Sequence, residues 1–217
     1  MRIRRGRRML ISVVAAASLT VAVVAALALG SGSKTEPSSA GRFRGSEPPG
    51  RYELPAFELQ SYRGEVLASD RLRGQVVLLT LLDSQCEQVC PLLASVIARA
   101  IDRLAPAEQA MVRALALTSD PAEDTPASVE RFLSAQRAEG RLDYLLGTEA
   151  QLRPLWRQLY VLPSLDTGND EIHSAPLRVY DRDGLWVATL HAGADLSEEN
   201  LIHDIRVALR VRRDETR

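Results

Sequence analysis

Cysteine, histidine and lysine are all scarce in this chain of 217 residues. It contains two cysteines, Cys86 and Cys90, three histidines and a single lysine, Lys34. A closed zinc site takes four protein ligands, so two cysteines cannot build one from thiolates alone. Positive charge is not in excess either. The formal net charge is −1 at pH 7, which argues against a nucleic-acid-binding protein.

The remaining composition is that of an ordinary folded domain. Hydrophobic residues make up 46% of the chain and charged residues 25%, which supports a real core under a soluble surface. No internal repeat is visible, which argues against a repeat architecture. The length fits one domain with appendages.

The amino end carries a long uncharged run behind a cluster of arginines. Arginines crowd residues 1–8, and the run from Met9 to Leu29 contains no charged side chain. A helix of about 20 apolar or small residues crosses a bilayer, and arginines stay on its cytoplasmic side. We therefore expect residues 9–29 to anchor the protein in the cell membrane as a single pass, with the domain facing the periplasm or outer side.

An alternative to the anchor is cleavage. Ala26-Leu27-Ala28 fits a signal-peptidase site, and cutting there would release the protein into the same compartment. In either case the compartment is oxidising, so a cysteine pair can rest as a disulfide there.

Composition also predicts the domain boundaries. Residues 30–51 are rich in Gly, Ser and Pro, which is typical of a flexible linker. The folded domain is expected over residues 52–211, and residues 212–217 form a charged tail.

Within the domain, strand patterns alternate with helix patterns. Two short apolar stretches around Arg63-Gly64 predict a hairpin. The strands expected after it are Val76–Leu82, Met111–Leu117, Leu177–Tyr180 and Leu185–Leu190, and Leu142–Leu146 is a further short apolar segment. The expected helices are Leu92–Leu104, Pro126–Ala138 with Thr125 or Asp124 as cap, Glu149–Tyr160 with Thr148 or its neighbour as cap, and Glu198–Val211 with Ser197 as cap. Residues 163–171 are polar and predict a loop or exposed hairpin. The alternation predicts an α/β, thioredoxin-like sandwich with an N-terminal hairpin.

The two cysteines lie where the first long strand ends and a helix begins. Backbone N–H groups and the helix dipole gather at such a junction, and they favour thiolate over thiol. If the segment from Cys86 to Cys90 is helical, side chains four apart share one face. The pair can then hold one soft metal ion, or form a disulfide after a small backbone adjustment. A purely structural disulfide is the alternative, although so small a loop would stabilise the fold only modestly.

Two sulfurs and one imidazole would suit a soft or borderline ion such as copper. His173 lies just before the strand Leu177–Tyr180. In a thioredoxin-like layout the start of that strand abuts the cysteine-bearing helix, so His173 can reach both sulfurs; the alternative is an exposed loop histidine. Pro176 enters the same strand, and in thioredoxin-like proteins such a proline is often cis. His191 and His203 are expected to be structural or solvent-exposed.

An ordered set of motifs resembles the SCO/SenC family of copper-binding, membrane-anchored thioredoxin-fold proteins. The motifs are Cys86-Glu87-Gln88-Val89-Cys90-Pro91 after an apolar strand, Asp120-Pro121 with Asp124-Thr125-Pro126, Gly147-Thr148 before Leu152-Arg153-Pro154-Leu155-Trp156, and His173-Ser174 before Tyr180-Asp181-Arg182-Asp183-Gly184. Together they span about residues 52 to 210 in the order that the family has them.

The resemblance implies that Cys86, Cys90 and His173 bind a copper ion. It also implies a role in assembling the binuclear copper site of cytochrome c oxidase, with the copper-bearing subunit or another copper carrier as partner. The protein would then be a metallochaperone, or it would reduce the cysteines of that site.

The sequence departs from the family pattern around the first cysteine. Asp83, Ser84 and Glu87 stand where the family often has an aromatic residue, Thr and Pro. Asp83 and Glu87 add negative charge beside the thiols, which raises thiol pKa values and can favour a cation. Three other functions remain open: a thiol–disulfide oxidoreductase without stable metal, a peroxidase-like thiol enzyme, and a non-catalytic binding module with a structural disulfide.

Overall fold

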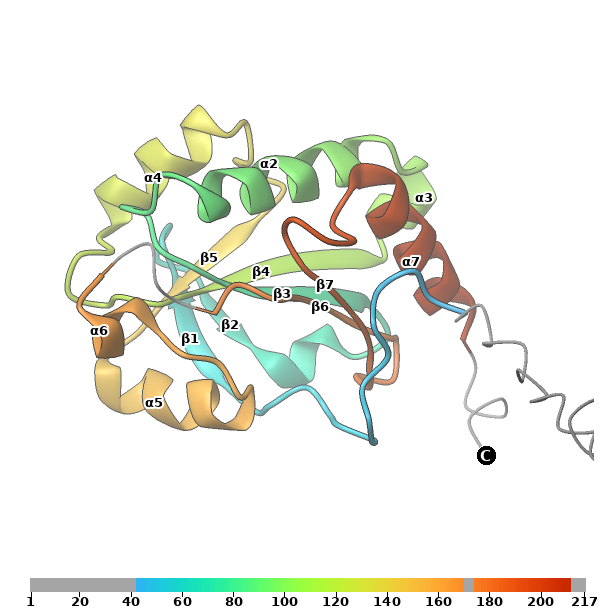
Figure 1. Cartoon of the computed structure of the whole chain (residues 1–217), viewed down its shortest axis with the longest axis horizontal. Helices are drawn as coiled ribbons and strands as arrows, with labels where there is room; N and C mark the ends of the chain where they lie inside the picture. Colours follow the sequence, from blue (N-terminus) through green and yellow to red (C-terminus); the bar gives the residue numbers. More distant parts are fainter. Residues whose placement is uncertain (1–41, 170–173, 212–217) are drawn as a thin grey trace, which may run out of the picture. The chain divides into compact units, whose positions relative to one another are not determined.

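The computed structural model describes residues 42–169 and 174–211. Within these ranges one mixed sheet of seven strands forms the centre of the domain, in the order β2-β1-β5-β4-β3-β6-β7 (Figure 1). The strands are β1 (Glu58–Ser61), β2 (Val66–Ala68), β3 (Val76–Leu82), β4 (Val112–Thr118), β5 (Asp143–Leu146), β6 (Leu177–Tyr180) and β7 (Trp186–Leu190). The helices are η1 (Ser69–Leu72), α2 (Val89–Asp102), α3 (Pro106–Gln109), α4 (Pro126–Ala135), α5 (Glu149–Gln158), α6 (Ser164–Thr167) and α7 (Glu198–Arg210).

The central strand β3 explains the unbroken apolar run in its sequence. All seven of its residues are buried. It pairs in parallel with β4 and antiparallel with β6. Helices α2, α4 and α7 cover one face of the sheet and α5 and α6 the other (Figure 1). A strand covered on both faces has no polar side, so its side chains need not alternate.

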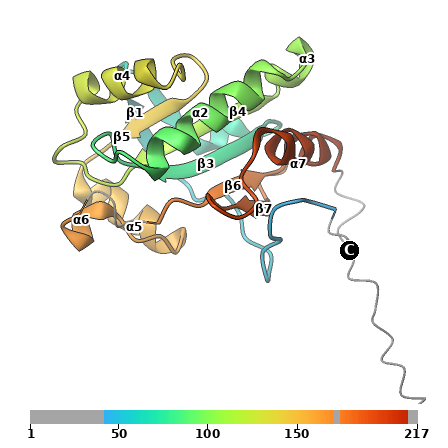
Figure 2. The same ribbon diagram turned by 45° about the horizontal axis from the view of Figure 1, so that its top comes forward.

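Helix α2 carries the second cysteine and lies on the same face of the sheet as α7 (Figure 2). Its buried side chains include Leu93, Ile97, Ala100 and Ile101, whose spacing of three and four residues makes one apolar stripe. Pro91 is in the first turn, where a missing N–H has no intrahelical acceptor. The strand–helix junction is therefore rigidly packed on its inner side.

The predicted thioredoxin-like α/β architecture and the N-terminal hairpin are both confirmed. Three helices begin at the expected capping residues, because Thr125, Thr148 and Ser197 each accept a hydrogen bond from a backbone N–H three residues on. The prediction of a loop at residues 163–171 was incomplete. The described part of that stretch forms the short helix α6, which ends at Gly168 with a left-handed φ of 64°.

The first described residues, 42–51, lie against the domain instead of forming part of a free linker. Phe43 is buried in the core, and Ser46 pairs with Thr189 on β7. The N–H groups of Arg44 and Gly45 donate to the buried carboxylate of Asp204 at 2.7 and 2.9 Å. A buried carboxylate needs such donors. A linker predicted from Gly, Ser and Pro content takes no account of these long-range contacts.

The expected anchor at residues 9–29 and the tail at 212–217 lie outside the described residues. Within residues 42–169 and 174–211, no helix has both the length and the apolar character that a membrane span needs.

Candidate metal centre

Both cysteines lie at the carboxyl end of β3, as predicted, and both are buried. Cys86 is 3% exposed and Cys90 0%. Cys90 is the second residue of α2, whereas Cys86 belongs to the loop that precedes the helix. The segment between them is therefore not one continuous helix. The loop folds back and brings Cys86 to Cys90.

The two thiols are hydrogen-bond partners, and this contact dominates the chemistry of Cys90. The hydrogen bond with Cys86 raises the pKa of Cys90 far above its ordinary value, and burial raises it further. The negative charge of Asp83 acts in the same direction, as the sequence predicted for an acidic neighbour. The Asp83 N–H, which donates to the Cys90 sulfur at 3.5 Å, offsets these effects only in part.

The expectation that the helix start favours a thiolate was therefore wrong for Cys90. The start of α2 does lie beside this thiol, but the side chain faces the core and not the solvent. Burial removes water from the charged form, and the neighbouring thiol stabilises the protonated form. The surroundings of Cys90 therefore favour its thiol over its thiolate.

Asp83 holds the start of the cysteine loop through hydrogen bonds to its carboxylate. Its carboxylate is fully buried. One oxygen accepts the N–H of Gln85 at 2.8 Å. The other accepts the hydroxyls of Ser164 at 2.5 Å and Ser119 at 3.4 Å. Asp83 thus ties the loop to the ends of β4 and to α6, which sequence reasoning did not connect.

Asp124 holds the same loop from the other side. Its carboxylate accepts the N–H of Ser84 at 2.9 Å and the hydroxyls of Thr118 and Tyr144 at 2.5 and 2.6 Å. Burial raises the pKa of Asp124, and these hydrogen bonds oppose the rise. The sequence placed Asp124 only as a possible cap for α4, but Thr125 is the cap. Its contact with Ser84, forty residues away, was not foreseeable from spacing.

The strand expected to follow the third ligand lies next to the cysteine strand. Because β6 is antiparallel to β3, its amino end lies at the carboxyl end of β3, where the cysteine loop starts. Ser174 and Leu162 exchange hydrogen bonds just before β6, at 2.8 and 2.9 Å. Val89, Ser174 and Ala175 line one pocket. His173 itself lies outside the described residues, so its predicted approach to the sulfurs stays a prediction.

Pro176, His203 and His191 lie within the described residues, so the structure places each of them. Every peptide bond among the described residues is trans, so Pro176 is not cis. His203 Nδ1 contacts Asp204 at 2.9 Å, a structural position. His191 is exposed and lines the pocket that also reaches Val89. Within residues 42–169 and 174–211 no three His, Cys, Asp or Glu side chains gather as a metal site, so the described part supplies two sulfurs.

A mixed sheet with helices on both faces, and two buried thiols where its central strand meets a helix, defines a dithiol protein of thioredoxin-like fold. Residues 46–210 match the model of the SCO1/SenC family. The chain belongs to that family.

The chain is also similar to known relatives and solved structures. A SCO2-like protein of Rickettsia typhi is 24% identical over 157 residues, which are 70% of this chain and 75% of the relative. The structure of BsSco, a member of the Sco family of cytochrome c oxidase assembly proteins, matches with a TM-score of 0.64 at 20% identity, over 77% of this chain and 99% of BsSco. The copper-bound structure of ScoI from Bradyrhizobium japonicum matches with a TM-score of 0.58 at 24% identity, over 71% and 98%. These structural matches support the fold.

Proposed function

We propose that this protein is a copper metallochaperone that binds its cargo through Cys86, Cys90 and His173. In this role the protein would deliver the copper to the binuclear site of cytochrome c oxidase. The observation that carries it is the contact of two buried thiols at the strand–helix junction. Membership of the SCO1/SenC family supports it, as do the copper-bound ScoI structure and the assembly role of the Sco family to which BsSco belongs.

The donor set fits copper better than other common metals. Two thiolates brought together by the cysteine loop are soft ligands, which select Cu(I), and an imidazole as third ligand also accommodates Cu(II). Three ligands leave the site open to exchange, so a partner's cysteines can replace them one at a time. The raised pKa of Cys90 means that loading releases protons.

Residues 9–29 would hold this chaperone in the cell membrane, with the domain on the periplasmic or outer side. The copper-bearing subunit of the oxidase, or another copper carrier, would meet it there. Cleavage of the amino end would give a secreted form in the same compartment.

Copper titration of the full chain tests the proposal. We expect one Cu(I) per reduced chain, loss of binding in Cys86→Ser and in Cys90→Ser, and weaker binding in His173→Ala. His203→Ala is the matched control, because His203 contacts Asp204 and not the cysteine segment. Binding that His173→Ala leaves unchanged would remove His173 from the proposed site, and no stoichiometric binding would remove the chaperone.

A second function, thiol–disulfide reductase, is favoured by the same sulfur contact. A thiolate of the reduced pair would attack a partner disulfide and form a mixed disulfide, and the second cysteine would displace the partner thiol. The partner gains two electrons, and Cys86 and Cys90 end as a disulfide. His173 would be dispensable for this reaction. A turnover assay with His173→Ala therefore separates the two functions.

A further inference from the structure

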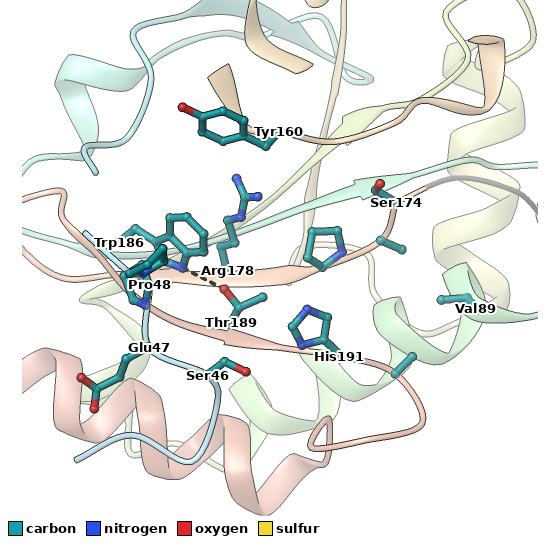
Figure 3. Close-up of a pocket in the computed structure, with 14 residues that line it drawn as sticks. Ser46, Glu47, Pro48, Val89, Tyr160, Ser174, Arg178, Trp186, Thr189 and His191 are labelled. Carbon is teal, nitrogen blue, oxygen red and sulfur yellow. Dashed lines mark hydrogen bonds between the residues drawn. The ribbon is translucent and has the colours of Figure 1, made fainter. Parts of the chain in front are cut away.

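A pocket of about 600 Å³ opens beside β6 and β7 (Figure 3). Its wall is formed by the first described residues, by the end of α5 and by the two strands, and it reaches Val89, the residue before Cys90. The residues that matter for its chemistry are Arg178, Trp186, Tyr160 and Glu47. The copper proposal uses none of them.

Arg178 is a buried cation at this pocket. Its side chain is 7% exposed, and the guanidinium stacks on the Trp186 ring with 4.3 Å between the guanidinium carbon and the ring centre. The Trp186 indole N–H is held by the Ala188 carbonyl and the Thr189 hydroxyl at 2.9 and 2.8 Å. Figure 3 shows the guanidinium between Trp186 and Tyr160. This stacking contact fixes the orientation of the Arg178 guanidinium.

Among residues 42–169 and 174–211, no acidic side chain pairs with Arg178. Arg178 Nε is buried without a hydrogen-bond partner in the described part of the chain. The Tyr180 hydroxyl contacts the guanidinium, but burial raises the pKa of Tyr180 and keeps the hydroxyl neutral. Glu47 lines the pocket with its carboxylate turned away (Figure 3). A buried cation without a counter-charge is costly.

Tyr160 adds an unusual aromatic side chain at the rim. It is 74% exposed and has a left-handed φ of 49°. It follows the end of α5 at the position of a Schellman turn, with Val161 N–H donating to the Trp156 carbonyl and Tyr160 N–H to the Arg157 carbonyl. Glycine is the usual residue there. Tyr160 contacts the Tyr52 ring edge-on, with 6.3 Å between ring centres, and the residue stays largely exposed beside the pocket.

We propose that this pocket binds a carboxylate side chain of a polypeptide partner, with Arg178 as its counter-ion and Tyr160 and Trp186 as its aromatic walls. A carboxylate can take two parallel N–H bonds from one guanidinium, and the partner's flanking residues would pack on the rings. Because the pocket ends at Val89, a segment anchored here would lie alongside the cysteine pair. Carboxylate binding does not depend on copper, so this proposal can be tested independently of the proposed chaperone function.

The test uses the full chain without metal and reads the Trp186 indole N–H signal by NMR. Trp186→Phe identifies that signal, and the buried Trp156 indole, which donates to the Thr118 carbonyl, is an internal reference. The probes are acetyl-Ala-Glu-Ala-amide, its Gln counterpart and inorganic phosphate. Arg178→Gln removes the counter-ion. Arg157→Gln is the matched control, since Arg157 is an exposed arginine on α5 outside the pocket.

We expect a saturable shift of the Trp186 signal with the Glu peptide. The Gln peptide should bind at least about tenfold more weakly than the Glu peptide. Arg178→Gln should lose the difference between the two peptides, and Arg157→Gln should keep it. Equal binding of the peptides to the unaltered chain would overturn the proposal, whether or not Arg178→Gln folds. Tighter binding of phosphate than of the Glu peptide would also overturn it, in favour of an inorganic-anion site.

Discussion

The backbone of Asp83 donates a hydrogen bond to Cys90, and the negative charge of its side chain acts on the same thiol. The Asp83 N–H donates to the Cys90 sulfur at 3.5 Å, and its fully buried carboxylate raises the pKa of Cys90. One residue thus acts on the thiol in two opposite directions, and the carboxylate can be altered without the N–H.

Asp83→Asn should lower the pKa of Cys90, because it removes a negative charge and leaves the backbone donor in place. It should also destabilise the fold by about 1–3 kcal/mol, since Ser164 and Ser119 lose a charged acceptor. Alkylation rates of the two thiols against pH measure the first effect and urea unfolding the second. Asp70→Asn, an exposed change in η1, is the control. An unchanged pH profile of Cys90 would show that the carboxylate does not govern this thiol.

Copper affinity should rise with pH, because the high pKa of Cys90 means that the metal displaces a proton. For each proton released, the binding constant gains about tenfold per pH unit below the thiol pKa. Cu(I) competition titrations between pH 6 and 8 measure the slope. His191→Ala should keep the slope, because His191 is an exposed residue outside the cysteine pair. A slope of zero in the unaltered chain would mean that the cysteines bind no metal as thiolates.

Asp124 should make the protein less stable as the solution becomes less acidic. Burial raises its folded-state pKa above the ordinary 3.8, so between these values the folded state binds more protons than the unfolded state. The contribution is present in full below 3.8 and is lost as pH rises through the folded-state pKa. Asp124→Asn should remove this part of the pH dependence, measured by urea unfolding across the acidic range. Asp70→Asn should retain it.

Gly45→Ala should loosen the first described residues from the domain. A Cβ at Gly45 would lie 2.6 Å from the Thr189 carbonyl oxygen and 3.2 Å from an Asp204 oxygen, and neither the strand backbone nor the buried carboxylate can move easily. We expect a loss of about 1–3 kcal/mol in the free energy of unfolding. Gly50→Ala is the matched control, because its nearest atom is at 3.4 Å on the Tyr52 ring. Equal stability of the two variants would contradict the tight approach.

Tyr160→Gly should stabilise the end of α5 by up to about 1 kcal/mol, because glycine adopts a left-handed φ without steric cost. The same change should weaken binding of the Glu peptide, since it removes one wall of the pocket. Thermal unfolding and the Trp186 signal measure the two effects. Tyr160→Phe keeps the ring and should affect neither strongly. A large loss of stability in Tyr160→Gly would show that the contact of Tyr160 with Tyr52, at 6.3 Å between ring centres, outweighs the strain.

Local sequence pattern was enough to predict the longer helices and most strands of this protein, although it missed short helices such as α6. The apolar run Val76–Leu82, the caps Thr125, Thr148 and Ser197, and Pro91 in the first turn of α2 fix their elements through neighbours a few residues away. The ordered motifs from the cysteine segment to Gly184 were enough to predict the family. The linker prediction failed at residues 42–51 because Gly45 and Ser46 are held by Asp204 and Thr189, which are far away in the sequence.

Residue order and short-range periodicity were sufficient to predict the alternation of strands and helices, the place of the cysteine pair at a strand–helix junction and the membership of the family. The raised pKa of Cys90, the support of its loop by Asp83 and Asp124, and the lack of an acidic partner for Arg178 among the described residues became evident only in the folded domain. Burial, and the charges brought together by it, depend on which distant segments the fold packs side by side.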